Sequence, residues 1–76
     1  MSKLKTEEAH FLKRVRKHDD ENLERVALDS ERAIILGFRL EKRGLLNSYF
    51  DGCRNTDVVY LSDAGRAELK EWEVSK

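Results

Sequence analysis

The spacing of apolar residues changes at Gly44, and this change limits the folds open to the chain more than any other feature. Before Gly44, apolar side chains recur at the three- and four-residue intervals of amphipathic helices. After Gly44, "LLNSYF" and "VVYLS" are rich in β-branched and aromatic residues, and "DGCRNTD" between them has turn chemistry. The sequence therefore predicts helices followed by a β-hairpin, within one domain of 76 residues.

Residues that can cap helices divide the chain further. The caps are Thr6, Asp19 or Asp20, and Ser30, and they predict helices over residues 6–18, 20–28 and 31–43. Gly44 fits the position just past the end of the third helix. We expect hairpin strands over residues 45–50 and 58–61, and a last helix over residues 63–73 that Ser62 caps. The fold class is then α+β and mainly helical.

Gly65 in "YLSDAGRAEL" lies inside the last expected helix. Glycine in a helix interior costs about 1 kcal/mol relative to alanine, so its presence calls for a packing reason. We expect that the missing Cβ lets this helix come close to another backbone of the helical core.

Charge and cysteine content narrow the setting of the protein. Fifteen basic and fifteen acidic residues give no net charge, but residues 32–44 contain four basic residues and one acidic residue. The single cysteine allows no internal disulfide, and the longest apolar run, "AIILGF", is too short to cross a bilayer. The first residues lack the pattern of a signal peptide, so we expect a cytoplasmic protein with no membrane partner.

The helices, the hairpin and two short motifs resemble the small winged helix-turn-helix proteins, in particular the MarR-like and PadR-like bacterial transcriptional regulators. The motifs are "RLEKRGLL" and "VVYLSDAGRAEL", with the charged loop around Arg54 between them, and the resemblance covers about residues 20–70. It implies three helices, a two-stranded wing and a C-terminal helix, with helix 31–43 inserted in the major groove of double-stranded DNA. It also implies a bacterial or phage regulator of transcription. The chain departs from the MarR-like pattern because it has few residues beyond this core to form dimerisation helices.

The outward side of helix 31–43 carries the residues expected to contact DNA. On the opposite, buried side of this helix we expect the core residues Ala33, Leu36, Gly37 and Leu40, with Ile34 near the border between the two sides. Arginine can pair with guanine O6 and N7, and an isoleucine can touch a thymine methyl group. The wing loop offers contacts to phosphates or to the minor groove. The predicted DNA-binding residues are Arg32, Ile35, Arg39, Lys42, Arg43, Arg54 and Asn55.

An alternative hypothesis uses the apolar residues of the same helix. Ile35 and Phe38 lie on its outward side, and an exposed apolar patch often marks a protein interface. Together with Trp72 they define a protein–protein interaction module without DNA binding, whose partner is another protein or a second copy of the chain. Surface cations of a helix are in many proteins simply solvated, but four cations within residues 32–43 favour sequence-specific DNA binding as the leading hypothesis.

The residues capable of metal or nucleophilic chemistry form no pattern. His10 and His18 are eight positions apart, too far for a pair of metal ligands on one helix, and Cys53 lies in a distant loop. No base or orienting group is placed to activate Cys53. We therefore expect no catalytic residues, no metal and no cofactor, and the protein is not expected to be an enzyme.

Overall fold

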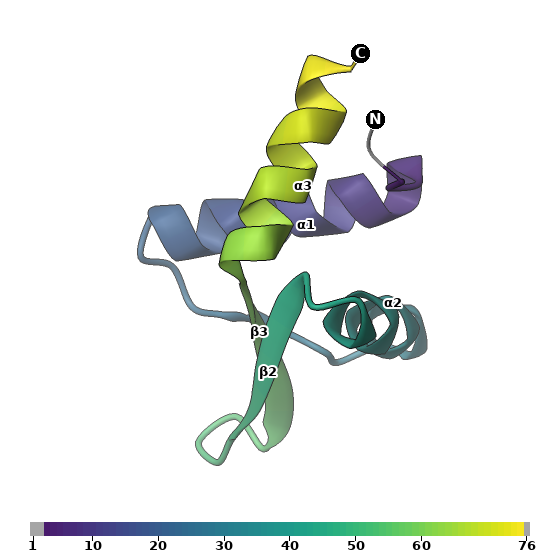
Figure 1. The fold of residues 1–76 in the computed structure, drawn as a ribbon. Helices are drawn as coiled ribbons and strands as arrows, with labels where there is room; N and C mark the ends of the chain where they lie inside the picture. The colour runs from purple at the N-terminus through teal and green to yellow at the C-terminus, as the bar shows by residue number, and fades with distance from the viewer. Residues whose placement is uncertain (1–2, 76) are drawn as a thin grey trace.

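The computed structural model describes residues 3–75 as an α+β fold with three helices and one three-stranded antiparallel sheet (Figure 1). The elements in chain order are α1 (Thr6–Asp20), β1 (Val26–Ala27), α2 (Glu31–Lys42), β2 (Leu46–Asp51), β3 (Thr56–Leu61) and α3 (Asp63–Val74). The strand order is β1-β3-β2. Buried side chains of α1, α2, α3 and the inner face of the sheet form one core.

The prediction of a helix over residues 20–28 is wrong. Helix α1 ends at Asp20, and Asn22, just beyond its C-cap Glu21, has a left-handed φ of 57°. The N–H group of Leu23 donates to the carbonyl oxygen of His18 at 2.9 Å, as in a Schellman motif. Asn22 is thus a helix stop, whereas the sequence interpretation took Asp19 or Asp20 as the start of a new helix.

Strand β1 occupies the second half of that segment and makes the sheet three-stranded, so the predicted two-stranded wing is also wrong. Val26 pairs with Val59, and Ala27 with Val58, in antiparallel register. A stripe made of Leu23, Val26 and Ala27 fits a short helix as well as a strand. Its hydrogen-bonding partner, strand β3, is about thirty residues away and decides between the two.

The hairpin after Gly44 is present with slightly different bounds from those expected. Strands β2 and β3 pair from Leu46 opposite Leu61 to Asp51 opposite Thr56, so the connecting loop is shorter than predicted. The carboxylate oxygen Oδ1 of Asp51 accepts hydrogen bonds from the N–H groups of Cys53 and Arg54, which closes the turn. Figure 1 shows the hairpin loop at the end of the molecule opposite to α3.

The first turn of α3 packs on the segment that joins α2 to β2. Ser62 caps α3 as predicted, since its hydroxyl accepts from the N–H group of Gly65 at 2.9 Å. A Cβ added to Gly65 would fall well inside the contact distance of the Leu45 carbonyl oxygen, and 3.0 Å from the Leu45 carbonyl carbon. The close backbone approach expected at Gly65 is therefore present, and its partner is the start of the hairpin instead of another helix.

Candidate interaction surface on α2

Helix α2 is specified by its ends. The hydroxyl of Ser30 accepts a hydrogen bond from the N–H group of Ala33 at 3.1 Å, as expected for the cap. Gly44, at φ 79°, ends the helix in a conformation that glycine adopts without strain. The helix buries Ala33, Leu36, Gly37 and Leu40. Figure 1 shows α2 at one side of the molecule, beside β2, so that the opposite surface faces solvent.

Three of the predicted DNA-binding arginines face carboxylates of α1. Arg32 forms a bidentate ion pair with Glu7, in which Nε of Arg32 lies 2.7 Å from Oε2 of Glu7. Arg43 lies 3.2 Å from Oε1 of Glu8, and Arg39 lies 3.7 Å from Oε2 of Glu8. The charges that sequence reasoning placed on a free cationic face are therefore largely neutralised within the chain.

The two glutamates differ in their surroundings. Glu7 is exposed, and its hydrogen bond with Arg32 lowers the pKa of the Glu7 carboxyl and raises the pKa of the guanidinium. Glu8 is only 3% exposed and also accepts a hydrogen bond from the N–H group of Lys5 at 3.0 Å. Glu8 thus joins the start of α1 to the last turn of α2. No local sequence signal marks this role, because it depends on how the two helices cross.

Apolar side chains occupy the solvent side of α2. Ile34, Ile35 and Phe38 are 39%, 40% and 53% exposed. Ile35 and Phe38 are found where the sequence placed them, while Ile34, expected near the buried border, is exposed. Glu31 and Lys42 extend this surface at the two ends of the helix, and neither has an ion-pair partner within residues 3–75. We call Glu31, Ile35, Phe38 and Lys42 the outer stripe of α2.

Strand β2 carries a further exposed aromatic residue, Phe50, two positions after a residue that contacts α2. The hydroxyl of Ser48 donates to Oε2 of Glu41, which joins β2 to α2. Side chains alternate along a strand, so Phe50 shares the face of β2 with Ser48. Phe50 is exposed. Sequence reasoning missed Phe50, although the two-residue period of "LNSYF" contained the signal.

The loop residues predicted to contact DNA lie apart from the outer stripe. Arg54 is exposed, and its guanidinium donates to the carbonyl oxygen of Arg25, before β1. Asn55 is exposed and completes the turn with a left-handed φ of 53°. Arg25 itself lies over the ring of Tyr60, 4.9 Å from its centroid. Arg54 is thus turned towards the sheet edge near β1.

Trp72 is a core residue in this fold. It is 9% exposed, and its ring meets His10 of α1 edge-on, with 6.1 Å between the ring centroids. The interaction hypothesis grouped Trp72 with Ile35 and Phe38. In the structure Trp72 is buried, whereas Ile35 and Phe38 are exposed.

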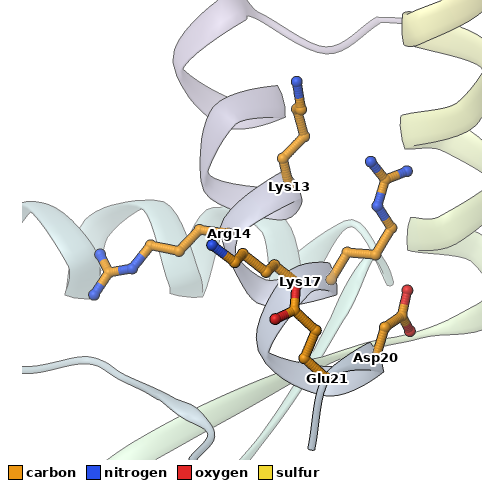
Figure 2. Close-up of a pocket in the computed structure, with 6 residues that line it drawn as sticks. Lys13, Arg14, Lys17, Asp20 and Glu21 are labelled. Atoms are coloured by element: carbon orange, nitrogen blue, oxygen red, sulfur yellow. The ribbon is translucent and has the colours of Figure 1, made fainter. Parts of the chain in front are cut away.

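A second charged surface lies on α1. It is a shallow hollow of about 520 Å³, lined by Lys13, Arg14, Arg16, Lys17, Asp20 and Glu21 (Figure 2). Two of its walls are held by α3, because Arg16 pairs with Glu73 at 2.8 Å and Asp20 pairs with Arg66 at 2.8 Å. The lining mixes four cations with two acids and comes from α1 and its C-cap Glu21, so it is an open, mixed-charge surface without the enclosure of a ligand pocket.

Residues 3–75 contain neither a cluster of side chains that could hold a metal ion nor a helix that could span a membrane. That part of the chain has no group of three or more His, Cys, Asp or Glu side chains placed to hold a metal ion. Cys53 is exposed, and Nδ1 of His18 lies 2.6 Å from the carbonyl oxygen of Glu24. None of the helices in the described range has the length and apolar character needed to span a bilayer.

Comparison with known proteins gave no assignment. No protein-family model matches the sequence, and searches of curated proteins and of solved structures found no significant match.

Proposed function

We propose that the chain is a protein–protein interaction module that binds its partner through the exposed surface of α2. The observation that carries this proposal is the exposure of Ile34, Ile35 and Phe38 side by side on one helix. Exposed apolar area is costly in water, at about 25 cal/mol per Å², and a partner that covers it gains this free energy. Anchors at three- and four-residue spacing are typical of a helix that binds another protein.

The charges around α2 support a protein partner. Charges of both signs are equal in number on α2, its C-cap and the two glutamates of α1 that pair with it. The cations are Arg32, Arg39, Lys42 and Arg43, and the carboxylates are Glu7, Glu8, Glu31 and Glu41. A surface that is neutral overall lacks the attraction that supplies most of the affinity for a nucleic acid backbone. A neutral, partly apolar surface is instead what the rim and centre of a protein interface require.

Site-specific photocrosslinking tests this proposal. A benzoyl-phenylalanine residue in place of Phe38 should form a covalent protein adduct in the native cell, because the partner covers this position. The same group in place of the exposed Lys70 on α3 should give little adduct. Equal adduct formation at the two positions would contradict a binding surface on α2.

Double-stranded DNA is the second candidate partner, as in the winged helix-turn-helix regulators that the motifs resemble. In its favour, every residue predicted to contact DNA is exposed, and α2 directly precedes the hairpin, as the recognition helix precedes the wing. Exposed ion pairs are worth only about 0–1 kcal/mol, so phosphates could replace Glu7 as the partner of Arg32. Against it, residues 20–28 do not form the helix that was expected directly before α2; strand β1 lies in this segment instead.

Titration with duplex DNA by fluorescence anisotropy tests the DNA hypothesis. If about four phosphates are contacted, the affinity should fall about a hundredfold between about 50 and 200 mM salt. Lys42→Ala should reduce the salt slope by about one, and Lys70→Ala should leave it unchanged. The absence of binding to any duplex at the lower salt concentration would exclude this candidate.

A further inference from the structure

The outer stripe of α2 has a sequence of charges and apolar groups that is complementary to itself. Glu31, Ile35, Phe38 and Lys42 follow one another at intervals of four, three and four residues, so they lie in line on the side opposite the buried residues. An acid stands at one end of the stripe and a base at the other, with two apolar side chains between them.

A second α2 that runs antiparallel matches this pattern. A two-fold axis through the middle of the helix pair places Glu31 of one copy opposite Lys42 of the other, and Ile35 opposite Phe38. A two-fold interface brings the same surface of both copies together, so every contact is made twice. In a parallel pair, by contrast, Glu31 would face Glu31 and Lys42 would face Lys42.

We propose that the partner of this surface is a second copy of the chain, bound through α2 in antiparallel orientation. This inference rests on the proposed function, because it names the occupant of the α2 surface. Pairing gives Glu31 and Lys42 the ion-pair partners that the described part of their own chain does not supply.

The neighbouring arginines do not oppose this arrangement. The antiparallel pair brings the Arg32 and Arg39 sides of both copies together. Their repulsion stays low, since Arg32 is paired with Glu7, and Arg39 lies near Glu8, within each copy. The contact involves mainly one helix of 12 residues from each side, and small interfaces, below about 1,200 Å², belong to weak complexes. The dimer is therefore expected to dissociate on dilution.

Sedimentation equilibrium of exchanged-charge variants tests the proposal. The wild-type chain should show a monomer–dimer equilibrium over a concentration series that reaches the millimolar range. Glu31→Lys and Lys42→Glu should each weaken the dimer at least about tenfold, because each places like charges opposite one another twice. The double variant Glu31→Lys/Lys42→Glu should recover most of the affinity, since the opposite charges face each other again.

Two controls separate dimerisation from folding and from other partners. Lys70→Glu reverses a charge on α3 and should leave the dimer unchanged, while Phe38→Ser should make the chain monomeric. Circular dichroism of each variant reports whether α2 is still folded. A monomeric wild-type chain, or a double variant no tighter than the single ones, would overturn the second copy as the occupant. A monomeric chain whose position 38 still crosslinks to a different protein would overturn this inference alone and leave the proposed function standing.

Discussion

Replacing Gly65 with alanine is expected to lower the melting temperature by about 12 °C or more. The new Cβ would overlap the carbonyl oxygen of Leu45, which is backbone and cannot turn aside as a side-chain end can. The same oxygen accepts the N–H group of Ser62 at 3.2 Å, so a shift of α3 would also strain its cap. We expect a loss of about 3 kcal/mol or more, even though alanine favours a helix by about 1 kcal/mol.

Gly52→Ala is the matched control for this prediction. A Cβ at Gly52 has no atom within 4 Å, so the same chemical change should alter the free energy of unfolding by less than about 0.5 kcal/mol. Thermal denaturation followed by circular dichroism measures both variants. Equal melting temperatures for Gly65→Ala and the wild type would show that the close approach to Leu45 does not exist.

Asp19→Ala is expected to destabilise the protein by about 2 kcal/mol. Oδ2 of Asp19 accepts the N–H group of Leu61 at 2.8 Å, two residues past Val59, where the pairing of β3 with β1 stops. Oδ1 accepts from Arg25 at 2.7 Å, and the Asp19 side chain is only 7% exposed. Removing the carboxylate leaves a poorly solvated N–H group without a partner, which costs about 1–3 kcal/mol, and also loses a charged hydrogen bond.

The neighbouring aspartate supplies the control for Asp19. Asp20 pairs with Arg66 but is about half exposed, so Asp20→Ala should cost no more than about 0.5 kcal/mol. Asp19→Asn keeps an oxygen for the Leu61 N–H group and should recover most of the stability. Urea denaturation of the three variants separates these effects. A similar loss of unfolding free energy for Asp19→Ala and Asp20→Ala would contradict the role of the Asp19 carboxylate as the hydrogen-bond acceptor at the end of β3.

The ion pairs between α1 and α2 explain why one surface suggested two functions. From the sequence, Arg32, Arg39, Lys42 and Arg43 form a cationic side that suits a DNA groove. In the folded chain, Glu7 and Glu8 pair with the arginines, which stay exposed, and Ile35 and Phe38 add exposed apolar side chains to the same helix. The folded chain therefore favours binding of a protein through apolar contacts over binding of DNA through the cations.

The sequence by itself determined the features that depend on neighbours along the chain. Ser30 and Ser62 cap their helices, Gly44 ends α2, and the apolar period separates α1, α2 and α3 from the β2–β3 hairpin. Each of these rests on hydrogen bonds or side-chain spacing within a few residues, and such local preferences hold in any fold that keeps the segment.

Only the tertiary structure decided the features whose partners are distant in the sequence. Residues 26–27 become a strand because β3 supplies their hydrogen bonds. The arginines of α2 point towards α1 because Glu7 and Glu8 lie beside them where the two helices pack together. A strand of two residues and an ion pair between helices have almost no local signal. Their free energy comes from groups that meet only after the chain has folded.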